Sequence, residues 1–288
     1  MNDRPATVGQ ALVRARAMGL DRLDAQWLLG HQLQRDRTWL IAHDDAEIEA
    51  ADGAAFAQAC QRRADGEPLA YLTGERGFHG LRLRVTPDVL VPRPDTECLV
   101  DWALDLLRTW PPKPPPRVLD LGTGSGAIAL AVAHGHPAAR LSATDLSPAA
   151  LAVARANAQR LALAVEFAAG AWWQALPGDA RFDLVLSNPP YIAADDPHLP
   201  ALRHEPMLAL SPGGDGLGAL REIIAGAPAH LASGGWLLLE HGWDQADAVA
   251  ALLRSAGFEQ VATRFDLAGR PRCTGARSPA PAGTTGKA

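Results

Sequence analysis

Residues 183–191 join a short apolar run to a loop whose groups could hold a planar amide. A planar amide or amino nitrogen is a weak nucleophile, because its lone pair is delocalised into the neighbouring carbonyl or ring. The carboxamide oxygen of Asn188 and a main-chain carbonyl could accept its two N–H groups, while the ring of Tyr191 confines the planar group. Asn188, Pro189, Pro190 and Tyr191 are therefore candidate catalytic and substrate-binding residues.

The same stretch predicts how this loop is positioned. Leu184, Val185 and Leu186 form an apolar run without helical periodicity, which is typical of a strand buried on both faces of a parallel sheet. Such strands deliver their loops to a ligand crevice. The two prolines fix φ and push Asn188 out of the helical region, so the loop is extended and stiff. An Asn that only starts a turn is the alternative, and the upstream sequence decides between them.

A second candidate element is a glycine-rich turn between a predicted buried strand (117–121) and an apolar helix that starts at Ala127. The turn consists of Gly122, Thr123, Gly124, Ser125 and Gly126. Glycines let the backbone approach a ligand closely, and the N–H groups at the start of the helix face the crevice. The turn predicts a nucleotide cradle. Because Ala127 can occupy the last glycine position of the dinucleotide pattern, the spacing leaves NAD open.

Two further positions follow predicted strand ends. Asp145 lies 23 positions after Gly122, where a carboxylate, which only accepts hydrogen bonds, would bind ribose hydroxyls; the alternative is an N-cap of the next helix. Trp172 and Trp173 cannot both point into the core. At least one is predicted to line the crevice, where its flat ring could pack against adenine. The alternative is a loop tryptophan that covers the sheet edge.

Other polar residues carry weaker indications. His79 is predicted to face solvent on a hairpin, and Arg93 and Glu97 either cap a helix or form the wall of a cleft. The long loop after Tyr191 is predicted to be a lid. Its solvated residues are expected to be Asp195, Asp196, His198, His204 and Glu205. Their spacing matches no metal pattern, so we predict no metal site.

The overall composition is that of a soluble globular protein. The chain has 288 residues, of which 48% are apolar and 20% are charged, and a formal net charge of −5. This charge disfavours a primary nucleic-acid binder, which normally presents a basic face. Cys60, Cys98 and Cys273 lack the spacing of a disulfide framework or a zinc site, in agreement with a reducing cytoplasm. No signal peptide or membrane segment is indicated, and a monomer is the expected state.

Hydrophobic periodicity divides the chain into four parts. They are predicted to be a helical bundle (1–75), a β-hairpin linker (76–92), an α/β domain (93–278) and a disordered tail (279–288). Asp21 is a candidate N-cap in the bundle, and an antiparallel strand near 272–276 is expected to close the sheet. Residues 1–92 contain 11 Lys and Arg against 13 Asp and Glu, net −2, so we expect the bundle to recognise a protein substrate rather than nucleic acid.

Five segments spread over the chain carry a family resemblance. They are residues 71–75 (Tyr-Leu-Thr-Gly-Glu), 86–97, 120–126 (Asp-Leu-Gly-Thr-Gly-Ser-Gly), 187–191 (Ser-Asn-Pro-Pro-Tyr) and 239–242 (Leu-Glu-His-Gly). Together they resemble the PrmC/HemK family of protein-(glutamine-N5) methyltransferases over nearly the whole chain. The resemblance implies an α/β class I S-adenosylmethionine-dependent methyltransferase fold, a Rossmann-like seven-stranded sheet with a small N-terminal helical bundle.

The resemblance also implies an activity. It is the transfer of a methyl group from S-adenosylmethionine to the glutamine of the Gly-Gly-Gln motif in bacterial peptide chain release factors, with S-adenosylhomocysteine as the product. The glycine turn, Asp145, Trp172 and Asn188 would bind the cofactor, with Trp172 beside the adenine, and residues 188–191 would hold the glutamine amide. Family members usually carry an acidic residue before this tryptophan, whereas the present chain has Ala171 and so lacks one adenine contact.

The expected mechanism is direct in-line attack of the amide nitrogen on the sulfonium methyl, in which orientation contributes roughly 7–11 kcal/mol. No residue is predicted to act as a general base, and Tyr191→Phe is expected to be mild because only the ring face is used. A DNA or RNA amino-methyltransferase with the same loop is the alternative, although it would add a basic or aromatic platform. An inactive cofactor-binding adaptor would have lost the glycine turn or the Asn-Pro-Pro-Tyr loop, and both are intact.

Overall fold

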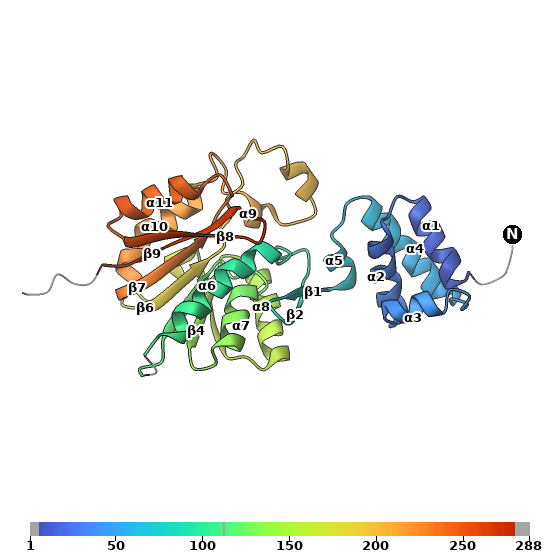
Figure 1. Cartoon of the computed structure of the whole chain (residues 1–288), viewed down its shortest axis with the longest axis horizontal. Coiled ribbons are helices and arrows are strands. Elements are labelled where there is room, and N and C mark those ends of the chain that lie inside the picture. The colour runs from blue at the N-terminus through green and yellow to red at the C-terminus, as the bar shows by residue number, and fades with distance from the viewer. Residues whose placement is uncertain (1–5, 112, 280–288) are drawn as a thin grey trace, which may run out of the picture. The chain divides into compact units, whose positions relative to one another are not determined.

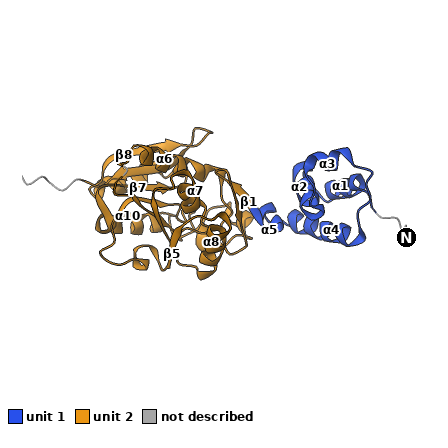
Figure 2. Cartoon of the chain, turned by 90° about the horizontal axis from the view of Figure 1, so that it is seen from below, with its two compact units in different colours: residues 1–75 blue, residues 76–288 orange. Residues whose placement is uncertain are grey.

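The computed structural model of the chain describes residues 6–111 and 113–279. The chain forms two compact units, residues 1–75 and residues 76–288, coloured blue and orange in Figure 2. Of the tail predicted over 279–288, all but the first residue lie outside the described residues. No helix in the described part of the chain is long and apolar enough to cross a membrane.

The first unit consists of short helices. They are α1 (Val8–Ala17), α2 (Arg22–Leu33), α3 (Arg37–Ala42), α4 (Ala50–Ala64) and α5 (Leu69–Thr73). The side chains of Thr7, Asp21 and Asp36 cap the first three helices by accepting a main-chain N–H, which confirms the predicted cap at Asp21. Leu29 of α2 and Cys60 of α4 lie in one buried cluster, so this unit has an apolar core of its own.

The second unit begins with a hairpin of β1 (Glu75–Phe78) and β2 (Leu81–Arg84) and is built around a seven-stranded sheet. The strands of that sheet are β3 (Arg117–Leu121), β4 (Arg140–Asp145), β5 (Val165–Ala169), β6 (Phe182–Ser187), β7 (Leu231–Glu240), β8 (Glu259–Phe265) and β9 (Pro271–Arg277). Their order is β5-β4-β3-β6-β7-β9-β8, and all pairs are parallel except those of β9 with β7 and β8. The predicted fold class and closing antiparallel strand are confirmed.

Helices cover both faces of this sheet, as Figure 1 shows. They are α6 (Glu97–Arg108), α7 (Ala127–Gly135), α8 (Pro148–Leu161), α10 (Gly218–His230) and α11 (Ala246–Ser255). Val118 and Leu184 pack with α6, α7 and α8 on one face, and Leu119 and Val185 pack with α10 and α11 on the other. Successive residues of a strand point to opposite faces, so β3 and β6 are apolar throughout because both of their faces are covered.

The order of the strands brings three predicted loops together. After β3 the chain adds β4 and β5 on one side and then crosses to add β6 and β7 on the other. Leu121 at the end of β3 pairs with Thr144 of β4 and with Ser187 of β6. The segments that follow these strands therefore leave the sheet at the same edge, where open α/β sheets bind their ligands.

Candidate functional site

A pocket of about 520 Å³ lies at this edge. Of the predicted cofactor-binding residues, it is lined by Gly122, Thr123, Gly124, Ser125, Asp145, Trp172 and Asn188. Gly126 does not line the pocket. It is instead the N-cap of α7 with φ of 85°, and a Cβ there would come within 2.9 Å of Leu130. The last glycine of the turn thus serves the packing of the helix.

Hydrogen bonds hold the glycine turn against β4. The main-chain N–H groups of Gly122 and Thr123 both donate to the carbonyl of Thr144 at 2.9 Å. Asp145 Oδ2 accepts the N–H of Gly124 at 2.8 Å, and Oδ1 accepts the N–H of Ser147 at 2.9 Å. Burial raises the pKa of Asp145, and these hydrogen bonds oppose the rise. The N-cap of α8 is Ser147, so the capping alternative for Asp145 is wrong.

A buried carboxylate stabilises the glycine turn through hydrogen bonds. Asp120 of β3 is fully buried, accepts the Thr123 hydroxyl at 2.6 Å and accepts the N–H of Ala129 at 3.2 Å. Burial raises its pKa to about 7, while the bonds to Thr123 and Ala129 oppose the rise. Asp120 was not predicted to be a site residue. The available signal was a carboxylate inside an apolar strand, which is rarely buried without a role.

The two adjacent tryptophans face different surroundings. Trp172 opens the short helix η2 (Trp172–Ala175), has φ of 45° and lines the pocket. A Cβ on Gly122 would lie 3.1 Å from its ring, so the absence of a side chain at Gly122 admits the indole. Trp173 is only 9% exposed, donates its Nε1–H to the Ile223 carbonyl at 3.1 Å and stacks on His230. One tryptophan therefore lines the pocket, as predicted, and it is Trp172.

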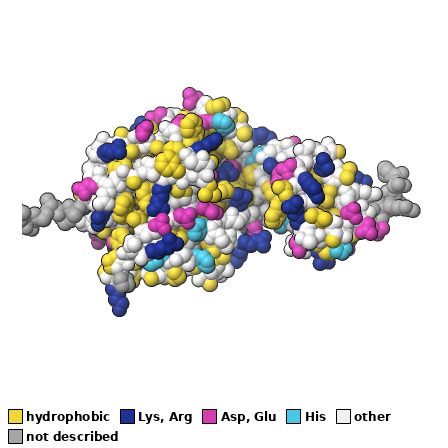
Figure 3. Space-filling view, viewed as in Figure 1, with side chains coloured by type: hydrophobic (Ala, Val, Ile, Leu, Met, Phe, Trp, Pro, Cys, Tyr) yellow, Lys and Arg dark blue, Asp and Glu magenta, His cyan; other side chains and the backbone are white. Residues whose placement is uncertain are grey.

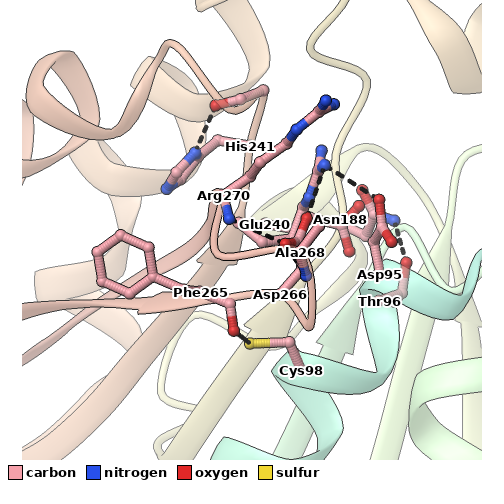
Figure 4. Close-up of polar contacts among 12 residues, drawn as sticks. Asp95, Thr96, Cys98, Asn188, Glu240, His241, Phe265, Asp266, Ala268 and Arg270 are labelled. Atoms are coloured by element: carbon pink, nitrogen blue, oxygen red, sulfur yellow. Dashed lines mark hydrogen bonds and ion pairs between the residues drawn. The ribbon is translucent and has the colours of Figure 1, made fainter.

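The Asn-Pro-Pro-Tyr loop is divided between the pocket and the interior. Asn188 and Pro190 line the pocket, whereas Pro189 is buried and Tyr191 is not among the lining residues. Asn188 donates its Nδ2–H to the hydroxyl of Thr96 at 3.1 Å (Figure 4), and its Oδ1 receives no hydrogen bond from the described residues. Thr96 ends the short helix η1 (Pro94–Thr96). The free acceptor of Asn188 is thus available to a ligand.

The side chain of Tyr191 makes an internal contact instead. Its phenol donates to Glu240 Oε1 at 3.2 Å, and its ring packs against the buried cluster that includes Leu119 and Val185. Burial raises the pKa of Tyr191, and the nearby charge of Glu240 adds to the rise. Neither Glu240 nor Thr96 was predicted to be a site residue.

The long loop after Tyr191 does contribute to the pocket, through residues that include Leu208 of α9 (Met207–Leu210) and Ser211. One expectation for this loop is wrong. Glu205 was expected to be solvated, but it is only 7% exposed, forms an ion pair with Arg93 and accepts the N–H of Val91 at 3.1 Å. These partners compensate for the burial of its charge, and Arg93 itself lines the pocket.

The hairpin residue His79 also differs from expectation. Its side chain is only 22% exposed, and its Nε2 lies 3.0 Å from Asp101 Oδ1. Its main-chain N–H donates to Glu97 Oε1 at 2.9 Å. Glu97 therefore holds the hairpin and, unlike Arg93, is not among the residues lining the pocket. In the ranges 6–111 and 113–279, no group of three His, Cys, Asp or Glu residues could hold a metal ion.

A mostly parallel sheet whose glycine turn, acidic strand end and Asn-Pro-Pro-Tyr loop border one pocket defines the class of Rossmann-like methyltransferases. Two family models match the chain: the PrmC N-terminal domain over residues 8–74 and the methyltransferase small domain over residues 100–245. The chain belongs to the release factor glutamine methyltransferase family, which confirms the resemblance of the motifs and makes the protein a methyltransferase.

The membership rests on close relatives. The release factor glutamine methyltransferase of Bordetella pertussis is 55% identical over 259 residues, covering 89% of this chain and 95% of the relative. That of Xylella fastidiosa (strain Temecula1) is 52% identical, covering 93% and 98%. Among solved structures, the N-terminal domain of human METTL16 in complex with SAH has a TM-score of 0.52 at 18% identity, covering 81% of this chain and 84% of that chain. This last likeness is one of fold alone.

Proposed function

We propose that this protein transfers a methyl group from S-adenosylmethionine to the side-chain amide nitrogen, N5, of the glutamine in the Gly-Gly-Gln motif of bacterial peptide chain release factors. The observation that carries the proposal is the orientation of Asn188, whose Nδ2–H is taken by Thr96 and whose Oδ1 is left for a ligand N–H. We infer the substrate from the relatives, which are named release factor glutamine methyltransferases.

The residues of the pocket fit S-adenosylmethionine. Gly122 leaves room for Trp172, whose ring would border the adenine, and the carboxylate of Asp145 would accept the ribose hydroxyls while it holds the glycine turn. When bound, the cofactor would supply an electrophilic sulfonium methyl group. Ala171 also lines the pocket and offers no charge to this ligand.

The protein's own contribution to the reaction is orientation. Asn188 Oδ1 would accept one N–H of the substrate amide, and a main-chain carbonyl of the loop would accept the other. Two consecutive prolines keep this frame rigid. A planar amide gains most from being held in line with its electrophile, for which well-oriented groups contribute roughly 7–11 kcal/mol. After transfer the nitrogen loses one proton, which can leave to water.

We assign the recognition of the protein substrate to the helical unit (residues 1–75), whereas the hairpin that follows packs into the core of the second unit. Among the described residues of the unit, five large apolar side chains are exposed: Val13, Met18, Leu23, Trp27 and Ile41. Its formal charge is negative, since residues 1–75 contain 8 Lys and Arg against 12 Asp and Glu. Exposed apolar groups on an acidic surface favour a protein partner over a nucleic acid.

A DNA or RNA amino-methyltransferase is the second candidate for the same loop geometry. On the face of the catalytic unit seen in Figure 3, basic and acidic side chains are interspersed and do not form a broad basic patch. A nucleic-acid enzyme would gain affinity from such a patch. The charges on this face therefore favour a protein substrate over a nucleic acid.

One assay compares these functions directly. The purified protein is incubated with labelled S-adenosylmethionine and, in parallel, with a release factor, the same release factor carrying Gln→Ala in its Gly-Gly-Gln motif, duplex DNA and RNA. We expect label only on the unaltered release factor. Labelling of the altered release factor would place the methyl group elsewhere, and labelling of DNA or RNA alone would support the second candidate.

A further inference from the structure

Two segments far apart in the sequence line the pocket in addition to the loops at the strand ends. The first wall, residues 88–93, follows the hairpin and contributes Leu90 and Arg93, among others. The second wall, residues 206–212, lies in the long loop after the Asn-Pro-Pro-Tyr motif and contributes Leu208 and Ser211, among others. The contacts that hold these two walls in place decide how readily a ligand can leave the pocket.

Glu205 directly precedes the second wall and is bound to the first. Its side chain is only 3% exposed. Oε1 forms an ion pair with the guanidinium of Arg93, and Oε2 accepts the main-chain N–H of Val91 at 3.1 Å. Both oxygens of this carboxylate are therefore bound to the first wall.

These contacts fix the position of Glu205 relative to the first wall. Burying a carboxylate is costly unless an opposite charge and hydrogen bonds compensate for it. Arg93 supplies the charge, Val91 supplies a main-chain donor, and hydrogen bonds to an ionised acceptor are stronger than neutral ones. Loss of one partner would leave the buried charge incompletely compensated. Glu205 therefore restrains the start of the second wall.

The other end of the second wall is bound to the residue that follows Tyr191. The main-chain N–H of Ile192 donates to the carbonyl of Leu210 at 3.0 Å. The hydroxyl of Ser211 donates to the carbonyl of Ile192 at 2.6 Å. The second wall is thus attached at its start to the first wall, and near its end to the Asn-Pro-Pro-Tyr loop.

Helix α9 lies between these two attachments. It has only four residues, and its Leu208 lines the pocket while remaining 58% exposed. A helix this short is not stable in isolation, because the cost of nucleation exceeds the gain from its few hydrogen bonds. The position of α9 at the pocket therefore depends on its attachments, and loss of the one at Glu205 would free Leu208 to move away.

We propose that Glu205 is a positioning residue of the cofactor pocket: it fixes the second wall to Arg93 and Val91 and thereby slows the release of S-adenosylmethionine and its product. This inference rests on the proposed function for the identity of the ligand. The effect of Glu205 on the second wall can be measured in the protein alone.

The first test measures how fast S-adenosylhomocysteine leaves the protein. Glu205→Gln keeps the shape and one acceptor oxygen for Val91 but removes the charge that pairs with Arg93. Labelled S-adenosylhomocysteine, displaced by an excess of the unlabelled compound, is expected to dissociate about 10-fold faster, as for the loss of one charged hydrogen bond. Asp195→Asn, an exposed carboxylate of the same loop, is the matched control and is expected to leave the rate unchanged.

The second test asks whether Glu205 acts through Arg93. Arg93→Gln leaves the carboxylate buried without its counter-charge, so dissociation is expected to be at least as fast as in Glu205→Gln. Adding Glu205→Gln removes that uncompensated charge. The double variant is therefore expected to release the ligand no faster than Arg93→Gln alone, whereas independent effects would multiply. Multiplying effects would overturn the proposal.

A third measurement separates this inference from the proposed function. In the protein without ligand, hydrogen–deuterium exchange of the amides of residues 207–211 is expected to be faster in Glu205→Gln than in the parent, while residues 122–126 exchange as before. If this pattern is found but the parent does not bind S-adenosylhomocysteine, the proposed function fails and the role of Glu205 in holding the wall stands.

Unchanged exchange of the second wall in folded Glu205→Gln would overturn the proposal, and so would unchanged dissociation of the ligand. Arg93→Lys provides a second variant in case Glu205→Gln does not fold. It keeps the positive charge but lacks the planar guanidinium, so a smaller acceleration of both processes is expected. Parent-like rates of both processes in Arg93→Lys and in Arg93→Gln would equally contradict the role of the ion pair.

Discussion

Asp145 Oδ2 accepts the main-chain N–H of Gly124 at 2.8 Å, although the two residues lie 21 positions apart. The carboxylate that is proposed to bind the ribose therefore also fixes the shape of the glycine turn. Its second oxygen is held by the N–H of Ser147, so the group is oriented before any ligand arrives. Preorganisation of this kind lowers the entropic cost of binding.

Replacement of Asp145 by Ala is expected to weaken the binding of S-adenosylmethionine by about 1.5–3 kcal/mol, as for hydrogen bonds to a charged group. The variant also frees the N–H of Gly124, so the glycine turn loses a restraint as well as a ligand contact. Isothermal calorimetry measures the effect, with Asp179→Ala, an exposed residue of the same unit, as the control. An unchanged affinity in Asp145→Ala would rule out the ribose contact.

Tyr191→Phe is expected to be more harmful than the sequence suggested. The ring is kept, but Glu240 loses a hydrogen-bond donor in a buried place, which costs about 1–3 kcal/mol of the free energy of unfolding. Because the bond is strongest to the ionised carboxylate, the cost should be larger at pH 8 than at pH 6, on either side of the Glu240 pKa of about 7. Urea unfolding of both proteins at the two pH values checks this. Equal stability at pH 8 would contradict a structural role for the phenol.

Asp120→Asn is expected to change the pH dependence of stability. The pKa of Asp120 rises on folding from 3.8 to about 7, mainly through burial, so the folded state binds more protons than the unfolded state between these values. The free energy of unfolding of the parent protein should therefore fall as the pH rises from about 4 to about 7. Asn does not titrate, so the fall should be smaller in the variant, measured without cofactor. A parallel course of the two curves would show that Asp120 titrates normally.

A shortened chain that starts at Arg76 should bind S-adenosylmethionine like the parent protein but methylate an intact release factor poorly, because the helical unit is missing. The start must precede the hairpin, since Phe78, Leu81 and Leu83 belong to the core of the second unit and Asn157 bonds to the backbone of Arg84. The measurements are calorimetry for the cofactor and the rate with the release factor. A folded shortened protein that works at the full rate would assign the helical unit another task.

Local sequence patterns predicted the elements whose conformation is determined by neighbouring residues in the sequence. The strand before Asn188 and the glycine turn after β3 combine apolar runs with residues that restrict or free the backbone, so both were placed correctly from a few neighbouring residues. The alternation of strands and helices was also predicted from the sequence, whereas the order of the strands in the sheet was not. The predicted features depend on interactions over short distances along the chain.

The features that the sequence did not reveal depend on distant partners. Thr96 meets Asn188 across 92 positions, and Tyr191 meets Glu240 across 49. His79 and Glu205 were expected to face solvent, because their neighbours in the sequence do not indicate a partner. The partner of His79 is Asp101, and that of Glu205 is Arg93. A polar side chain can be buried when a partner compensates for the loss of water. When that partner is distant in the sequence, it can be identified only once the fold is known.

The opposite surroundings of Trp172 and Trp173 give the pocket an optical probe. Only the first of the pair borders the pocket, while the indole N–H of the second is taken by the Ile223 carbonyl in the interior. Indole emission responds to changes in its immediate polarity, so a ligand that enters beside Trp172 should shift the fluorescence of that one ring against the background of the others. A fluorescence titration can then follow ligand binding in the pocket in real time, without a radiolabel or a second protein.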